Sequence, residues 1–525
     1  MLSEIITRGV QEYPDNVALI YQDELITYSQ MASAIDKLAL GLCALGIEPG
    51  DSISILLPNC PAFVYTYYAG ASIGVVVVPV NPLLKAPELA YIWADSAVKL
   101  VVTVPQLLPV VAEARKGLPG LRCVVSTSNR EDLSDPNLVV SLGEFSTLRE
   151  LMEVGARAMT DGVSPVFDEE RHKGRHQTDC AVVIYTSGTT GHPKGAMLSH
   201  RNLQRNVEQT RAVLHFTETD RFLTILPLFH AFAGTVCMNV ALTAGCASLL
   251  MDSFQPARTL EAIRTHKITI FPAVPALFNG LLRLAPKPEE IAPVRLFVSG
   301  GAPLPAVTLQ ELESRYGIPV IEGDGPTECS PVTSVNPLGG PRKVGSVGLP
   351  VPGCEIAIFD DDDRPLPVDT VGEIVVRGDN VMLGYLNQPE ATAEAMRSGW
   401  YHTGDLGKID SDGYVFIVDR KKDMVITSGL NVYPREVEEA LYAHPAVQDA
   451  AVIGLPDAMR GEAVVAVVVL KPNETASARD LQRHCRDLLA NYKIPQRILF
   501  RETLPRGGTG KVLKRLLKKE LEMEN

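Results

Sequence analysis

The sequence predicts an α/β protein with a large N-terminal domain of stacked α/β subdomains, a β-barrel-like subdomain and a small α+β C-terminal domain. Much of the first 320 or so residues alternates helix-like segments with short β-rich runs, which is typical of parallel α/β layers. Near Gly345 the sequence changes to short strands and turn residues. The length of 525 residues also exceeds what one hydrophobic core usually serves.

The first helix and strand show the alternation. Residues Thr27–Gly46 have helical apolar spacing, begin at a Thr or Ser cap and end at a glycine, and a strand follows at 51–58. The same reasoning predicts strands at 98–104, 123–128, 180–187, 247–252, 268–275 and 294–301. The apolar stretch Pro61–Pro82 fits a buried helix and a core strand better than a membrane span, because prolines bracket it and four consecutive valines end it. A peripheral membrane contact stays open.

The part after Gly345 is predicted to be β-rich and then mixed. An acidic run at Asp360–Arg364 is interpreted as a solvated hairpin turn and not as a metal site. After Asp423 the pattern predicts helices at 434–447, 477–490 and 511–525, and strands at 449–456 and 462–470.

Composition excludes some classes of function. A net charge of -13 argues against a nucleic-acid binder, whose surface is normally basic. The nine cysteines are scattered without a CxxC pair, and the N-terminus lacks the features of a signal peptide. These observations favour a cytoplasmic protein.

One glycine-rich loop stands out. The stretch "YTSGTTGHPKGAMLSH", Tyr185–His200, follows an apolar strand and is rich in Ser, Thr and Gly. Backbone N–H groups and hydroxyls in such a loop suit the oxygens of a polyphosphate, although the P-loop pattern is absent. A flexible surface turn is the alternative if the loop is taken alone.

The loop resembles the signature of the adenylate-forming superfamily, which includes acyl-CoA synthetases, firefly luciferase and the adenylation domains of peptide synthetases. Further blocks follow in that family's order along essentially the whole chain: "LPLFHAFAG", "SGGAPL", "GPTE", "YHTGDLG", "DRKKDMVITSGLNVYPREVE" and "PRGGTGK". The resemblance implies an AMP-binding domain at 1–419 and a mobile C-terminal domain at 420–525, with the hinge at 420–422. It also implies a monomer or a homodimer.

The resemblance implies a ligase that uses ATP, Mg²⁺ and coenzyme A to convert a carboxylic acid through an acyl-adenylate to an acyl-CoA. The phosphate-binding residues would be Thr186, Ser187, Gly188, Thr189, Thr190 and Lys194. The remaining nucleotide-binding residues would be Gly301, Ala302 and Pro303 for adenine, Gly325 and Thr327 near the α-phosphate, and Asp405 and Arg420 for ribose. Glu328, with Thr186, would bind Mg²⁺, which prefers carboxylate and water ligands.

Two further sets of residues come from the C-terminal domain. By resemblance, Lys511 would reach into the site during adenylation only, and Lys422 would be the pivot of a domain rotation. After rotation the hairpin with Ser428, Gly429 and Tyr433 would line the channel for coenzyme A.

The acid is predicted from segments matching the family's acyl site, 229–234, 298–301 and 322–333. These segments contain no basic residue to pair with a second carboxylate, which disfavours dicarboxylates and amino acids. A medium- or long-chain fatty acid is favoured, and aromatic and cyclic acids stay open. His230 resembles a gate at the mouth of the acyl tunnel; a packed core histidine is the alternative.

Asp324 departs from the family's pattern, because an aromatic residue that stacks on adenine usually stands there. The absence of that aromatic residue would weaken ATP binding, shift stacking to a neighbouring residue, or let the Asp324 carboxylate bind the adenine amino group. Two other functions remain alternatives: an acyl-AMP ligase that loads a carrier protein, and a non-catalytic nucleotide-binding regulator.

Overall fold

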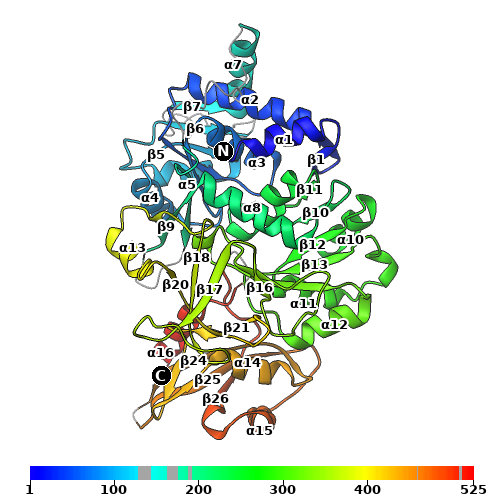
Figure 1. The fold of residues 1–525 in the computed structure, drawn as a ribbon, viewed down its shortest axis with the longest axis vertical. Helices are drawn as coiled ribbons and strands as arrows, with labels where there is room; N and C mark the ends of the chain where they lie inside the picture. The colour runs from blue at the N-terminus through cyan, green and yellow to red at the C-terminus, as the bar shows by residue number, and fades with distance from the viewer. Residues whose placement is uncertain (128–143, 162–175, 187–191, 458, 508–510, 525) are drawn as a thin grey trace.

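Two large sheets organise the N-terminal part of the chain (Figure 1). The computed structural model describes residues 1–127, 144–161, 176–186, 192–457, 459–507 and 511–524. The first sheet runs in the order β16-β15-β14-β13-β12-β10-β11-β1-β2, and the second in the order β19-β9-β8-β4-β3-β5-β6-β7. Pairing is parallel through the middle of both sheets and antiparallel at β1·β2, β14·β15 and β8·β9. The predicted α/β layers are therefore confirmed.

Among the strands of the two sheets, β3, β4, β5, β6, β8, β11, β12 and β13 coincide with predicted apolar runs, and the others were not predicted. Those of the first sheet are β1 (Val17–Tyr21), β2 (Glu24–Thr27), β10 (Arg221–Thr224), β11 (Ala247–Leu250), β12 (Ile270–Ala273), β13 (Leu296–Ser299), β14 (Val320–Asp324), β15 (Ser334–Val335) and β16 (Leu349–Pro350). Those of the second are β3 (Ser52–Leu56), β4 (Val76–Pro79), β5 (Val98–Thr103), β6 (Cys123–Ser126), β7 (Glu144–Thr147), β8 (Cys180–Thr186), β9 (Lys194–Ser199) and β19 (Gly384–Tyr385).

Helices connect and cover these strands. They are α1 (Glu4–Glu12), α2 (Tyr28–Ala44), α3 (Pro61–Ser72), α4 (Ala86–Asp95), α5 (Leu108–Ala114), α7 (Leu148–Thr160), α8 (His200–Leu214), α9 (Ala241–Thr243), α10 (Pro256–Thr265), α11 (Pro275–Leu284), α12 (Ala306–Tyr316) and α13 (Pro389–Ala395), with a π-helix, η4 (Ala233–Val240). Helix α2 begins as predicted, because Thr27 and Gln30 form a reciprocal capping box. One hydrophobic core joins the sheets, since buried residues of α2, α3, α8 and strands from both sheets pack in it.

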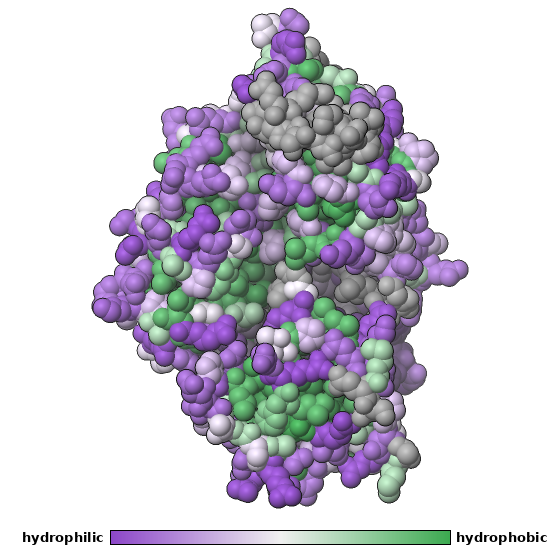
Figure 2. All heavy atoms as spheres, turned by 180° about the vertical axis from the view of Figure 1, so that it is seen from behind, coloured by the Kyte–Doolittle hydropathy of each residue, from purple (hydrophilic) through white to green (hydrophobic). Residues whose placement is uncertain are grey.

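The apolar stretch Pro61–Pro82 forms the buried helix α3 and the core strand β4, as predicted. Among the described residues, no helix combines the length and the apolar composition that crossing a membrane requires. Seen from behind, polar and apolar residues intermingle over much of the surface, with an apolar group on the lower, C-terminal part (Figure 2).

The predicted β-rich region is an antiparallel sheet in the order β17-β18-β20-β21. Its strands are β17 (Cys354–Phe359), β18 (Gly372–Gly378), β20 (Tyr401–Ile409) and β21 (Val415–Arg420). This sheet lies between the two large sheets and the C-terminal part (Figure 1). It therefore adjoins the segment from which the C-terminal part begins.

The C-terminal part has its own sheet, β23-β22-β25-β24 with β26 beside β25. Its elements are β22 (Val425–Thr427), β23 (Leu430–Val432), α14 (Pro434–Tyr442), β24 (Val447–Asp457), β25 (Gly461–Leu470), α15 (Ala478–Leu488), β26 (Arg497–Phe500) and α16 (Lys514–Glu524). Alternate residues of β24 and β25 enter two separate cores, one on each face, and every member of both cores lies between Val425 and Leu521. The boundary at residue 420 stays a prediction.

The C-terminal part makes polar contacts with the preceding sheet and with α12. The backbone N–H of Arg435 donates to Asp419 at 2.8 Å, and the Arg435 guanidinium donates to the carbonyl of Ile417 at 2.7 Å. The backbone N–H of Ala306 reaches Glu439 at 3.5 Å. Polar contacts of this kind are typical of domains that move relative to one another.

Candidate active site

The two ends of the glycine-rich loop are held together by strand pairing. Thr186 at the end of β8 is the register partner of Lys194 at the start of β9. Two residues before Lys194, the ring of His192 stacks on that of Tyr91 in α4, with 4.6 Å between the ring centroids. The predicted phosphate-binding residues Ser187, Gly188, Thr189 and Thr190 lie outside the described residues. Lys194, near the end of the loop, therefore lies opposite Thr186, at its start.

Glu328 lies beside this strand pair. It belongs to the short 3-10 helix η6 (Thr327–Cys329), is 8% exposed, and accepts a hydrogen bond from the Thr186 hydroxyl at 3.3 Å. The same oxygen, Oε1, accepts from the hydroxyl of Tyr385 at 2.9 Å. Lys194 Nζ lies 5.1 Å from the centroid of the Tyr385 ring. The structure thus brings together Thr186, Lys194 and Glu328, and it adds Tyr385.

The chain before Glu328 turns sharply. A side chain at Gly325 would overlap the carbonyl group of Pro331, so only glycine fits there. Gly301, in the segment predicted to face adenine with Ala302 and Pro303, has φ +76°, the left-handed region. Both glycines therefore meet backbone requirements of the strand ends that border the site.

Asp405 and Arg420 form the second predicted cluster. They are cross-strand partners on β20 and β21, and Arg420 Nε lies 3.0 Å from Asp405 Oδ1. Burial, together with the negative charge of Asp405, raises the pKa of the nearby Asp324 carboxyl to about 6. Asp324 thus stands beside the predicted ribose carboxylate, at the end of β14.

Lys511 faces the same cluster. Burial lowers the pKa of its ammonium to about 8, the charge of Arg420 also lowers it, and Asp405 and Asp423 act in the opposite direction. Burial likewise lowers the pKa of His230 to about 4, and the charge of Lys511 adds to this. These couplings put the Lys511 ammonium within electrostatic reach of both Asp405 and His230.

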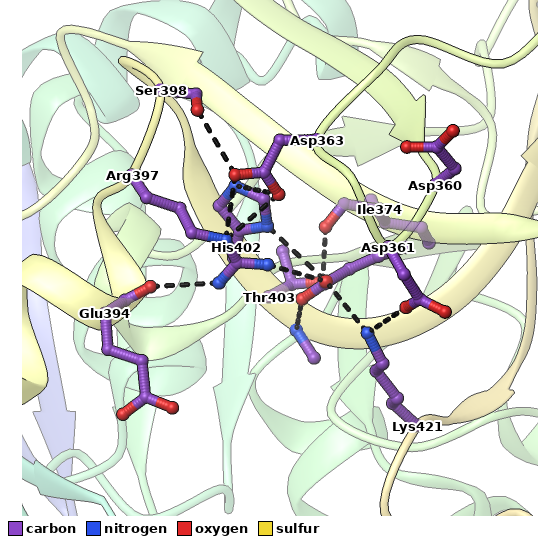
Figure 3. Close-up of polar contacts among 12 residues, drawn as sticks. Asp360, Asp361, Asp363, Ile374, Glu394, Arg397, Ser398, His402, Thr403 and Lys421 are labelled. Atoms are coloured by element: carbon purple, nitrogen blue, oxygen red, sulfur yellow. Dashed lines mark hydrogen bonds and ion pairs between the residues drawn. The ribbon is translucent and has the colours of Figure 1, made fainter.

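A polar network surrounds His402 and Thr403, which precede Asp405 on β20 (Figure 3). Its centre is Glu373, which is 7% exposed and accepts from the backbone N–H of Gly404 at 3.2 Å. Arg397 and Lys421 lie 3.3 and 3.6 Å from its other oxygen, and His402 Nδ1 lies 3.4 Å from it. The network therefore ties the strand of Asp405 to Lys421, within the predicted hinge.

The acidic run at 360–364 forms the predicted turn, but two of its carboxylates are paired with residues outside the run, and Asp362 is paired with Arg364 within it. Asp361 lies 2.7 Å from Lys421, and Asp363 lies 3.0 Å from Arg397 (Figure 3). Interpreting the run as a solvated turn therefore captures its geometry and misses these ion pairs.

A small apolar pocket of about 50 Å³ adjoins the cluster. His230 lines it, and the Nδ1 of this ring accepts a hydrogen bond from the backbone N–H of Phe232 at 3.3 Å. The predicted acyl-site segments contribute most of the lining: His230, Phe232, Val298, Ser299, Gly300, Gly301, Gly323, Asp324, Gly325, Pro331 and Val332. Helix α8, η4 and β15 contribute Thr210, Leu214, Val236 and Val335, which were not predicted. The gate role of His230 stays a prediction.

The residues predicted to line a coenzyme A channel lie on the C-terminal part. Ser428 and Gly429 form the turn between β22 and β23, with φ of 53° and 78°. Both are exposed, while Tyr433 precedes α14 and is half-buried. Lys422 lies in the turn between β21 and β22. In this structure the hairpin is exposed, while Lys511 is electrostatically coupled to Asp405 and Arg420 of the predicted nucleotide site.

The sequence did not predict Tyr385 or Thr210 as site residues, for different reasons. Tyr385 lies on β19, a strand of two residues that pairs with β9, so no periodic pattern marks it. Thr210 lies in a helix whose sequence is largely polar, and only the packing of α8 reveals that it is buried.

Comparison with known proteins gives the families, sequences and structures to which the chain is similar. The profile of the family described as AMP-binding enzyme matches residues 6–386, and that of the AMP-binding enzyme C-terminal domain matches residues 436–511. The chain is 36% identical to a long-chain-fatty-acid–CoA ligase of Bacillus subtilis, over 100% of this chain and 95% of that protein. It is 35% identical to a feruloyl-CoA synthase of an Amycolatopsis species, over 97% and 96%. A crystal structure of the anthranilate CoA ligase AuaEII with anthranoyl-AMP superposes with a TM-score of 0.90 and 27% identity, covering 100% of this chain and 97% of the other.

Proposed function

Because this chain belongs to the AMP-binding enzyme family and is an AMP-forming acid–thiol ligase, we propose that it activates a medium- or long-chain fatty acid as an acyl-adenylate and transfers the acyl group to coenzyme A. The observation that carries the proposal is that three groups lie near Asp324, which lines the apolar pocket. These groups are the Glu328–Thr186 pair, the Asp405–Arg420 pair and the half-buried Lys511.

In the first step a carboxylate oxygen of the acid attacks the α-phosphorus of ATP, and the bond from that phosphorus to the leaving pyrophosphate breaks. No proton transfer is needed, so positioning and charge compensation are the main tasks. Lys194 would neutralise the departing pyrophosphate, and Asp405 would accept hydrogen bonds from the ribose hydroxyls. Lys511 would bridge the acid and the α-phosphate, for which its ammonium must be charged.

The residues around Glu328 fit a magnesium ion. Mg²⁺ is commonly held by one or two carboxylates, with water and substrate phosphates completing six ligands. Glu328 supplies one buried carboxylate, and the Thr186 hydroxyl beside it supplies a second oxygen. When bound, the ion would offset the negative charge of the phosphate oxygens. Tyr385 would keep the carboxylate oriented by its hydrogen bond to Oε1.

In the second step the thiolate sulfur of coenzyme A attacks the acyl carbon, the carbon–oxygen bond to AMP breaks, and AMP leaves. Lys511 has no task in this step, so its loop can withdraw. We propose that the C-terminal part then rotates about Lys422 and brings Ser428, Gly429 and Tyr433 to the site. The polar contacts and separate cores of this part support that motion.

The small size of the pocket favours the shorter acids. A volume of about 50 Å³ corresponds to roughly four water-sized spheres, about a third of a cavity of roughly 150 Å³ that holds benzene. A six-membered ring or a long chain would therefore need side chains such as Phe232 or Leu214 to move. The name of the Amycolatopsis relative refers to an aromatic acid, which supports an aryl acid as a second candidate.

The test is coenzyme A-dependent release of AMP with acids from C2 to C18, benzoate and cyclohexane carboxylate. We expect the best rates with medium-chain or six-membered-ring acids, and pyrophosphate exchange into ATP without coenzyme A. If none of the acids supported pyrophosphate exchange, the enzymatic proposal would be refuted and a nucleotide-binding regulator would be favoured. Exchange with thioester formation only on a phosphopantetheinyl carrier protein would instead identify an acyl-AMP ligase.

A further inference from the structure

Two buried hydroxyl groups in the acyl pocket lack hydrogen-bond partners. Thr210 and Ser299 both line the pocket and are 0% and 1% exposed. Neither Thr210 Oγ1 nor Ser299 Oγ has a partner among the residues that the structure describes. Leaving a buried hydroxyl unpaired costs free energy, because the group has lost its hydrogen bonds to water. The pocket is therefore not wholly apolar.

Thr210 differs from the buried hydroxyls of Thr66 and Ser96. In a helix, such a group usually donates to the carbonyl one turn earlier. Thr66 donates to Ala62 at 2.7 Å, and Ser96 donates to Ile92 at 2.6 Å. Thr210, in the middle of α8, makes no such bond. Its hydroxyl is fully covered and has no partner in the described part of the chain, so a molecule in the pocket would reach it once a neighbouring side chain moves aside.

The surroundings of Thr210 are fixed by hydrogen bonds. One turn earlier on α8, the side chain of Asn206 accepts from the backbone N–H of Val332 at 3.0 Å and donates to its carbonyl at 2.6 Å. Val332 and Leu214, one turn after Thr210, also line the pocket. Thr210 is thus held rigidly in an otherwise hydrocarbon wall.

Ser299 occupies a different part of the wall. It ends β13 and immediately precedes Gly300 and Gly301, in the segment predicted to face adenine. Ser299 is therefore expected near the carboxyl end of the acid, whereas Thr210, on α8, is expected to face its apolar part. No lysine or arginine is among the described residues that line the pocket, so we expect a group bound by these hydroxyls to be neutral.

We propose that the preferred acid carries a neutral oxygen substituent, a hydroxyl or carbonyl group on its apolar part, that hydrogen-bonds the hydroxyl of Thr210. This inference rests on the proposed function and narrows its substrate class. A phenolic or other oxygenated aryl acid and a hydroxy- or oxo-alkanoic acid share this chemistry. Thr210 is then a specificity-determining residue, and Ser299 gives a second contact nearer the carboxyl group.

The test compares matched acids that differ only in this oxygen. Coenzyme A-dependent AMP release is measured with 4-hydroxybenzoate against benzoate, 4-hydroxycinnamate against cinnamate, and 6-hydroxyhexanoate or 5-oxohexanoate against hexanoate. We expect kcat/KM to favour the oxygenated acid of at least one pair by about tenfold or more. The aryl pairs and the alkyl pairs tell which carbon framework bears the oxygen.

Thr210→Val is the decisive variant, because valine keeps the shape and removes only the hydroxyl. The preference should fall to near unity, with kcat/KM for the unsubstituted acid maintained or raised. Thr259→Val is the matched control, since Thr259 is also a fully buried helical threonine without a partner but lies outside the pocket lining. It should leave the preference unchanged.

The outcomes separate the two proposals. Activity with unsubstituted acids that exceeds activity with every oxygenated partner, or a preference that Thr210→Val leaves intact, would overturn this inference alone. Absence of adenylation with all acids would overturn the proposed function instead.

Discussion

The lowered pKa of Lys511 predicts how the adenylation step depends on pH. Its ammonium has a pKa of about 8, because the side chain is buried and lies near Arg420. An exposed lysine loses its proton only near pH 10.4. If adenylation needs the charged ammonium, the loss of activity should begin near pH 8.

The magnitude follows from that value. About nine-tenths of the free enzyme carries the charge at pH 7, and about one-tenth does at pH 9. The kcat/KM for acid-dependent pyrophosphate exchange into ATP should therefore fall roughly tenfold between these pH values. This ratio reports the ionisation of free enzyme, so ligand binding does not obscure the result. The sign is a loss with rising pH, since the protonated form is the active one.

Lys511→Arg tests the assignment, because a guanidinium keeps its charge throughout this range. Its absolute activity will be lower, since arginine has a different shape, but its profile should be flat from pH 7 to 9. Lys519→Arg, at an exposed lysine on α16, should retain the fall. Thioester formation from supplied acyl-adenylate should not fall with pH in any variant. A fall that persists in Lys511→Arg, or a wild-type profile that is flat to pH 9, would refute the reasoning.

One further prediction concerns ATP binding, and another concerns the stability that the network around Glu373 provides. Asp324→Tyr should lower the apparent constant for ATP by about tenfold through stacking on adenine, whereas Asp324→Asn, which only removes the charge, should change it less; an unchanged or raised constant in the tyrosine variant would give Asp324 a role of its own. Glu373→Gln should lower the stability of the N-terminal part by about 1–2 kcal/mol, because Arg397 and Lys421 lose their most buried partner and keep only Asp363 and Asp361, while Asp361→Asn at an exposed ion pair should cost under about 1 kcal/mol; equal shifts in denaturation midpoint would contradict this difference.

Local signals in the sequence were sufficient for much of the fold. The helix at 28–44 and the strand ending at Thr186 were predicted because capping residues and apolar periodicity act over a few residues. Contacts within the site were less accessible. Nothing near Glu328 in the sequence indicates that the hydroxyl of Tyr385, which arrives on a two-residue strand, would bind its carboxylate.

The network around Glu373 shows the same limit for charged groups. Asp361, Arg397 and Lys421 each look like ordinary surface residues when read in their own segments. They meet because the turn after β17, the segment after α13 and the end of β21 converge on one side of the antiparallel sheet. Burial of Glu373 makes the meeting matter energetically, and burial is a property of the tertiary structure.

The separate cores of the C-terminal part also bear on how the chain is made. Every buried apolar residue of those two cores belongs to the stretch from Val425 onward, which is synthesised after the large sheets. Among the described residues, the cores of the large sheets and the lining of the acid pocket consist of earlier residues. The N-terminal scaffold can therefore complete its core during synthesis, and the residues from Val425 onward can fold onto it afterwards.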